Sequence, residues 1–171
     1  LVALLLKTKD AVHKVSIIPR GHAALGYTLQ LPLEDRYLIS RKELVDKITI
    51  LLAGRAAEET IFDEVTTGAH NDFEVATAYA QRMVCEFGMS EKLGNLTFGK
   101  RDKQVFLGRD LMAEKDYSEQ TAVLIDTEIK KIIDSCKKKA VSLLTENKDK
   151  LQMLAKHLLE REVLDGEEVC E

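Results

Sequence analysis

The sequence has few of the residues that mark several large protein classes. It contains three cysteines, two prolines and no tryptophan, and aromatic residues make up 5% of its 171 positions. No two cysteines form a CxxC pair, so the sequence predicts neither a disulfide framework nor a thiolate zinc site and is typical of a reducing compartment. Collagen-like and proline-rich proteins are excluded by the same composition.

Long hydrophobic runs and an excess of positive charge are also missing. The longest apolar run, Leu1 to Leu6, is about a third of the length that a membrane-spanning helix needs, so we expect the chain as given to be soluble. Lys and Arg number 25 against 29 Asp and Glu, for a net charge of −4. Nucleic acid is therefore not expected as a partner. The 45% of hydrophobic residues is enough for a folded core.

Two segments near the N-terminus predict a β-hairpin. Residues 12–21, VHKVSIIPRG, are rich in β-branched residues and end in proline and glycine. Residues 24–31, ALGYTLQL, alternate strictly, which places Leu25, Tyr27, Leu29 and Leu31 on one face of a strand. The apolar run before them is compatible with the end of a helix or with a short strand.

Helical periodicity dominates the remainder of the chain. Ser40 and Glu43 predict a capping box that opens a helix reaching about Glu59. Further helices are expected at about 71–87 (ended by Gly88), from Asp116 or Ser118 to about 144, at about 151–159 and from 165 onward. Residues 89–115 are expected to be loop with at most one more short strand. The fold class is thus mainly α with a small β-hairpin or sheet, with residues 1–115 as a compact core and 116–171 as a helical C-terminal part.

The residues contain no complete active site that can be recognised from spacing. The four histidines include no pair four residues apart, so a helical HExxH zinc motif is absent, as are a GxSxG elbow and a phosphate-binding loop. Asp72, in the segment TTGAHND, lies in the first turn of a predicted helix, where an acid ordinarily serves as a cap or favours the helix dipole.

Two further features have a structural and a functional interpretation. Arg55 is expected to pair with Glu59 four residues on, which leaves Glu58 without a local partner. Gly26 leaves space for another backbone, so the strand that contains it is either an edge that accepts a peptide or an ordinary hairpin irregularity. The lysines at 137–139 are expected to be a solvated face.

Six segments, taken in order, resemble the peptidase domain of the FtsH family of membrane-anchored ATP-dependent zinc metalloproteases. They are VHKVSIIPRG, ALGYTLQLP, LAGRAAEE, VTTGAHND, RMVCEFGMSEKLG and VFLGRD. The resemblance implies that Asp72 is the third zinc ligand and that Glu58 orients ligands through hydrogen bonds. An alternative within the family is that Glu58 is the ligand and Asp72 is structural. A substrate strand is expected near Gly26, Tyr27 and Thr28.

In that family an HEAGHA-type segment precedes residues like Leu1 to Leu6 and supplies two histidine ligands and the glutamate base. The resemblance therefore implies that this run ends a helix behind the zinc site. Because those three residues are not in the sequence given, we expect no peptidase activity and no tight stoichiometric zinc site in the 171 residues themselves.

The resemblance also implies properties of an intact protein. These are an upstream module that uses ATP and Mg²⁺, a membrane anchor before it, a homo-oligomeric ring, expected to be a hexamer, and unfolded or membrane-extracted polypeptides as substrates. The location would be an inner or organelle membrane, with the peptidase domain on the cytoplasmic face in a bacterium. The rival hypothesis is a non-catalytic helical ring scaffold. An HExxH directly before Leu1 would support the enzyme, and other residues there would support the scaffold.

Overall fold

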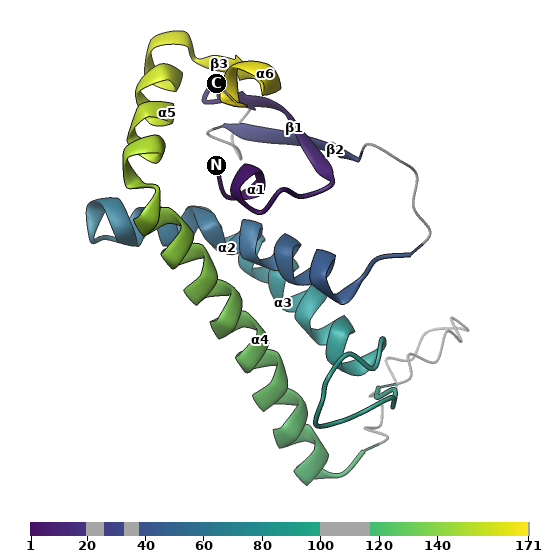
Figure 1. Cartoon of the computed structure of the whole chain (residues 1–171). Coiled ribbons are helices and arrows are strands. Elements are labelled where there is room, and N and C mark those ends of the chain that lie inside the picture. Colours follow the sequence, from purple (N-terminus) through teal and green to yellow (C-terminus); the bar gives the residue numbers. More distant parts are fainter. Residues whose placement is uncertain (20–25, 33–37, 100–116, 171) are drawn as a thin grey trace, which may run out of the picture.

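The computed structural model describes residues 1–19, 26–32, 38–99 and 117–170. Three helices form the body of the molecule, and a small sheet lies at one end of it (Figure 1). These helices are α2 (Arg41–Phe62), α3 (His70–Cys85) and α4 (Glu119–Glu146). A shorter helix, α5 (Lys148–Arg161), leads from the end of α4 back to the sheet.

The capping box predicted at the start of α2 is confirmed. Glu43 N–H donates to Ser40 Oγ over 3.2 Å, and Ser40 N–H donates to Glu43 Oε2 over 2.8 Å, so two otherwise unpaired backbone donors are satisfied. The helix runs three residues beyond the predicted end and stops at Asp63, whose φ is +53°. The start of α4 is likewise capped by Ser118, one of the two predicted caps.

The main core lies where α2, α3 and α4 meet. Their apolar positions recur at helical spacing, as the periodicity predicts, and exclude water from the three-helix contact. The most deeply buried members are Leu44, Ile48 and Leu52 of α2, Ala76, Ala80, Met83 and Val84 of α3, and Ile125, Ile132 and Cys136 of α4. A second cluster joins Val2, Ala56, Ala140 and Leu144.

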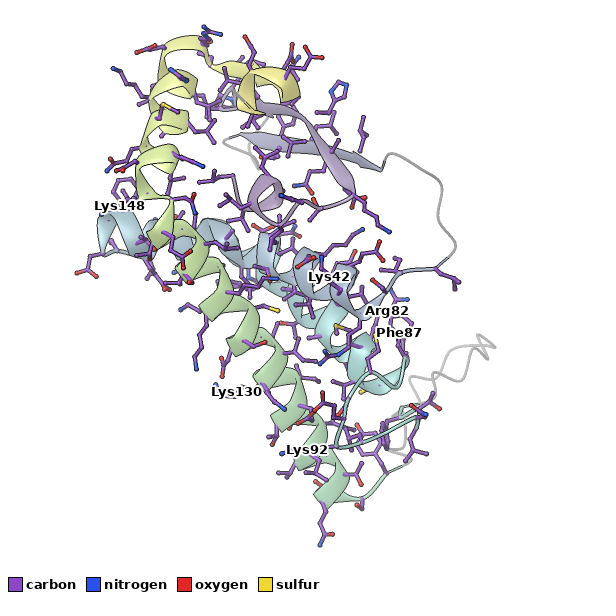
Figure 2. The ribbon with its side chains drawn as sticks, viewed as in Figure 1. Lys42, Arg82, Phe87, Lys92, Lys130 and Lys148 are labelled. Atoms are coloured by element: carbon purple, nitrogen blue, oxygen red, sulfur yellow. The ribbon has the colours of Figure 1, made fainter. Side chains whose placement is uncertain are left out.

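Phe87, the last residue of the helix predicted at about 71–87, lies outside α3. The helix ends at Cys85, two residues earlier than predicted, and Gly88 follows with a φ of +60°. Phe87 is therefore on the turn that leaves the helix and is exposed, with the Arg82 guanidinium 5.0 Å from its ring centre (Figure 2). The shortened helix is the reason that the 3.6-residue period fails at this position.

The predicted hairpin is confirmed, and it belongs to a larger sheet. Strands β1 (Asp10–Ser16) and β2 (Tyr27–Pro32) pair antiparallel, and β3 (Val163–Asp165) pairs antiparallel with the other side of β1. The sheet order β2-β1-β3 leaves β2 at one edge. The third strand was not predicted, because three residues carry no periodic signal and their partner is at the other end of the chain.

The two ends of the chain contain short helices. Helix α1 (Val2–Leu5) confirms the helical interpretation of the apolar run, and Val2 and Ala3 are buried against the helical body. At the other end, α6 (Gly166–Cys170) begins one residue after the predicted start, since Asp165 belongs to β3.

The segment that follows α3 is only partly described. Residues 89–99 contain no strand beyond an isolated bridge between Ser90 and Gly94, and most of the predicted loop, 100–115, lies outside the described residues. Ser90 Oγ donates to the buried carboxylate of Glu128 over 2.8 Å, which holds this segment against α4. Among the described helices, none combines the length and the apolar character required to cross a bilayer.

Gly26 offers a direct test of the hairpin geometry. A Cβ built at this position lies 2.5 Å from the carbonyl oxygen of Ser16, so a side chain forces the two strands apart. We expect Gly26→Ala to lower the free energy of unfolding by about 1–2 kcal/mol. Gly54→Ala is the matched control with the opposite sign, because Gly54 is exposed in the middle of α2 with open space around it. That variant should gain about 0.5–1 kcal/mol. Urea titration of both variants measures the difference, and equal effects would contradict the close approach.

Candidate metal centre

Asp72 lies at the start of α3 and does not cap it. The helix begins at His70 after a short 3₁₀ turn (Thr67–Ala69), its N-cap is Ala69, and no side chain makes the capping hydrogen bond. The Asp72 carboxylate is partly buried, and within the described part of the chain it makes no hydrogen bond or ion pair. Burial raises the pKa of this carboxyl above its ordinary value. Because it is partly buried and has no partner among the described residues, the Asp72 carboxylate is available to bind a ligand from outside them.

Glu58 holds the loop that leads into α3. The Thr66 hydroxyl donates to Glu58 Oε1 over 2.6 Å, and the Thr66 N–H donates to Oε2 over 3.4 Å. The same hydroxyl oxygen accepts from Gly68 N–H over 3.3 Å. Through these bonds, the carboxylate near the end of α2 sets the path of residues 66–69, directly before the helix that carries Asp72.

The ion pair predicted between Arg55 and Glu59 is wrong. Arg55 Nε instead lies 3.7 Å from Glu58 Oε2, and its Nη2 donates to the Thr66 carbonyl over 2.6 Å. Glu59 pairs with Lys137 of α4, at 2.9 Å. The helix spacing allows both partners for Arg55, and the position of the Thr66 loop decides between them. Sequence reasoning missed Thr66, because a partner eight residues away across a turn has no periodic signature.

The lysines at 137–139 are not simply a solvated face. Lys137 pairs with Glu59, and Lys139 Nζ donates to the buried carboxylate of Asp46 over 2.9 Å. Both contacts join α4 to α2. All three side chains reach solvent as predicted, but a cross-helix partner cannot be inferred from charge spacing within one helix, so the two contacts were not predicted.

Asp72 does not belong to a cluster of metal-binding side chains in the described part of the chain. Within the described ranges, no group of three or more His, Cys, Asp or Glu side chains is placed to hold a metal ion. His70 is exposed, and its Nε2 lies 3.4 Å from Glu74 Oε1. The Asp72 carboxylate, an oxygen donor of the kind that zinc accepts, fits one position of a zinc site.

The predicted substrate strand coincides in part with the sheet edge. Tyr27 and Thr28 pair with Ser16 and Val15 of β1, and in the described sheet no strand lies on the other side of β2. Gly26 has another role: the backbone that approaches it belongs to Ser16 and Ile17. The hairpin itself therefore explains this glycine.

The hydrogen bond from Thr66 to Glu58 can be tested by its effect on the pKa of Glu58. The Thr66 hydroxyl is the main cause that lowers the pKa of Glu58 below its ordinary value, since it stabilises the ionised form. We expect Thr66→Val to raise the pKa of Glu58 toward that of a free glutamate. Thr67→Val, which changes the next side chain in the same way, should leave it unchanged. Side-chain carboxyl NMR titration measures both, and identical curves would show that the hydroxyl does not bind Glu58.

Comparison with known proteins places this sequence in a family. The model of Peptidase family M41 matches residues 1–171. The ATP-dependent zinc metalloprotease FtsH of Bacillus subtilis is 56% identical over 169 residues, which cover 98% of this chain and 26% of that protein. The protein of the same name from Pseudothermotoga lettingae is 56% identical, and FtsH 3 of Petrotoga mobilis is 53% identical, each over 169 residues and 99% of this chain.

The chain spans about a quarter of the length of these relatives, 27% of the Pseudothermotoga protein and 26% of the Petrotoga protein. Identity of this level over almost every residue, together with a family model that matches from the first position to the last, extends the resemblance seen in six short segments to the whole chain. The chain belongs to Peptidase family M41, the FtsH peptidase family.

Proposed function

We propose that this chain is the peptidase domain of a membrane-anchored, ATP-dependent zinc endopeptidase that degrades unfolded and membrane proteins. The observation that carries the proposal is the 53–56% identity, over 98–99% of the chain, to proteins named ATP-dependent zinc metalloproteases. In this proposal, residues 1–115 are the core of the peptidase domain and residues 116–171 are its helical C-terminal part.

Asp72 is the residue of this chain that we assign to the metal. Its partly buried carboxylate, without a protein partner among the described residues, supports this role. Glu58 positions it indirectly, because both carboxylate oxygens of Glu58 bind Thr66 and so set the loop before α3. Because both carboxylate oxygens of Glu58 already accept hydrogen bonds, Glu58 is less suited than Asp72 to bind the metal. Zinc held at such a site would supply a Lewis acid and an activated water for peptide hydrolysis.

The substrate is proposed to add as a strand alongside β2, the outer strand of the described sheet. Backbone groups of an edge strand can pair with an extended peptide regardless of its side chains, which suits an enzyme with little sequence preference. Tyr27 and Thr28 lie on that edge and are supported as contact residues. For Gly26 the support is weaker, since its close neighbour is β1.

The rest of the proposal concerns a longer protein. It comprises a module that uses ATP and Mg²⁺, a membrane anchor, a homohexameric ring and a peptidase domain on the cytoplasmic side of a bacterial inner membrane. The 171 residues alone are proposed to be inactive, because the two histidines and the glutamate of an HExxH motif are not among them.

A chimera tests this proposal without the rest of the native protein. The chain replaces the matching 169 residues of the Bacillus subtilis relative. We expect the purified chimera to degrade an unfolded protein only when ATP and zinc are both present. A chimera that assembles and hydrolyses ATP but cleaves nothing, while the unaltered relative is active beside it, would favour the ring-scaffold hypothesis instead.

A further inference from the structure

A pocket of about 350 Å³ lies between α2, α3 and α4, and no role in the proposed peptidase has been assigned to it. This volume is within the range of pockets that hold small organic ligands. The pocket is beside the candidate site, because Phe73, which lines it, directly follows Asp72 in α3.

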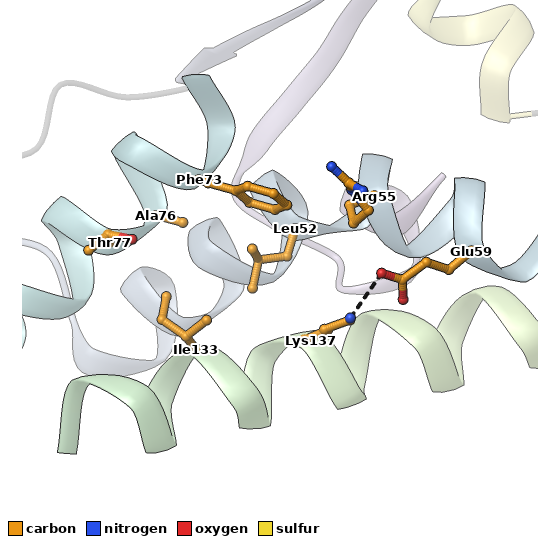
Figure 3. A pocket seen from close by; sticks show the side chains of 8 residues that line it. All are labelled: Leu52, Arg55, Glu59, Phe73, Ala76, Thr77, Ile133 and Lys137. Carbon is orange, nitrogen blue, oxygen red and sulfur yellow. Dashed lines mark hydrogen bonds and ion pairs between the residues drawn. The ribbon is translucent and has the colours of Figure 1, made fainter. Parts of the chain in front are cut away.

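The pocket has an apolar end and a charged end (Figure 3). Leu52, Phe73 and Ile133, one from each helix, form the apolar end, and they also belong to or pack against the main core. The charged end consists of three other lining residues, Arg55, Glu59 and Lys137. A ligand that fills both ends of the pocket must itself be amphipathic.

The charges at that end favour an anion. Two of the three lining groups are cations, and Glu59 is the one carboxylate among the described lining residues. Glu59 Oε1 lies 2.9 Å from Lys137 Nζ, and both side chains reach solvent, with exposed fractions of 33% and 46%. Lys137 keeps further N–H groups for a second acceptor, since an ammonium carries three donors.

Arg55 adds a second cation to the same pocket wall. Its Nε is buried without a hydrogen-bond partner, and the carboxylate oxygen of Glu58 is 3.7 Å away, beyond hydrogen-bond distance. The guanidinium also lies 5.3 Å from the centre of the Phe73 ring, so the cation borders the apolar end directly.

We propose that this pocket binds a small amphipathic carboxylate, with an aryl or alkyl body against Leu52, Phe73 and Ile133 and its carboxylate beside Lys137 and Arg55. Such a ligand touches α3 next to Asp72, and it touches Arg55, which binds the Thr66 loop. The site needs no metal and no other part of a longer protein, so its test is independent of the proposed peptidase activity.

The probes are 4-phenylbutanoate and its uncharged isostere 4-phenylbutanamide, titrated into the ¹⁵N-labelled chain and followed by NMR. We expect the acid to shift the amide signals of Leu52, Phe73 and Ile133 in a saturable manner, with a dissociation constant on the order of 1 mM. The amide should bind about tenfold more weakly. Equal binding of the two probes, or no saturable shift with the acid, would overturn the proposal.

Variants at the charged end test whether this end of the pocket attracts the carboxylate of the probe. Lys137→Met should weaken acid binding about tenfold without changing amide binding, while Lys138→Met, the matched change at the next exposed residue, should have no effect. Glu59→Gln should strengthen acid binding about threefold, because it removes a repelling carboxylate and releases Lys137. A Glu59→Gln chain that binds the acid more weakly would show that the carboxylate does not lie at this end.

A variant at the mouth locates the ligand. Thr77 lines the pocket and is exposed, so Thr77→Phe adds a ring to the space without cutting into the core. We expect it to abolish the saturable shifts, whereas Ala78→Phe, one exposed residue further along α3, should retain them. Circular dichroism confirms that both variants keep their helices. Shifts that persist in a folded Thr77→Phe chain would exclude this pocket as the site.

Discussion

Asp72→Asn is expected to abolish zinc binding and to lower proteolysis by more than about 100-fold in the chimera with the Bacillus subtilis relative. Groups that only support metal ligands typically cost 10–100-fold when removed, so the loss of a ligand should cost more. Asparagine keeps the size of the side chain but removes the negative charge that favours the metal. Metal analysis of the purified protein and the cleavage rate of an unfolded protein measure the two effects.

Two other carboxylates serve as comparisons for Asp72. Glu74→Gln makes the same chemical change on the same helix, at an exposed side chain that pairs with His70, and should leave zinc and activity unchanged. Glu58→Gln should lower activity while zinc is retained, because Glu58 acts on the loop through Thr66. If Asp72→Asn keeps its zinc and Glu58→Gln loses it, the two roles are reversed and Glu58 is the ligand.

Of the substitutions proposed for this chain, Asp46→Ala is expected to lower the free energy of unfolding most, by about 2–3 kcal/mol. The Asp46 side chain is 4% exposed, and it accepts from Lys42 Nζ and from Lys139 Nζ, each over 2.9 Å, so that it joins α2 to α4. Breaking a buried pair usually costs about 3–5 kcal/mol. The two lysines reach water (Lys42 is labelled in Figure 2) and can be solvated once the acid is gone, which places the expected loss lower.

The effect of Asp46→Ala should depend on pH. Burial by itself raises the pKa of Asp46, but the hydrogen bonds from Lys139 and Lys42 outweigh it, so that the pKa lies below the ordinary value. The stabilisation is therefore complete above the pKa of the unfolded chain, about 4, and is lost as the pH falls through the lower value of the folded protein. The difference between wild type and Asp46→Ala should be constant near neutrality and shrink in acid.

Asp134→Ala provides the control for this contact. Asp134 pairs with Lys130 one helical turn away on the exposed side of α4, at 3.4 Å. An exposed pair of this kind contributes about 0.3–0.5 kcal/mol. Urea titrations at neutral and acid pH compare the two variants. Equal losses for Asp46→Ala and Asp134→Ala, or a loss that does not change in acid, would show that the buried contact is not the stabilising one.

The prediction of local elements succeeded where the signal lies within a few residues. The Ser40 capping box, the helix that follows Ser118 and the pairing of the strands predicted within residues 12–21 and 24–31 each depend on neighbours at short spacing, and each is confirmed. Phe87 shows the limit of this approach, since its place in the periodic pattern is correct but the helix ends before it. The resemblance to the family was likewise found from short segments taken in order.

Residues a few positions apart are enough to predict the helices, the hairpin, the family and the candidate acids Glu58 and Asp72. The packing of distant segments sets the pairing of Arg55 with Glu58, the binding of Glu59 and Asp46 to lysines of α4, and the place of β3 in the sheet. Capping and periodicity act between residues a few positions apart, so they can be read along the chain. Cross-helix ion pairs, the third strand and the pocket depend on how distant segments pack, and that packing is set by the whole core at once.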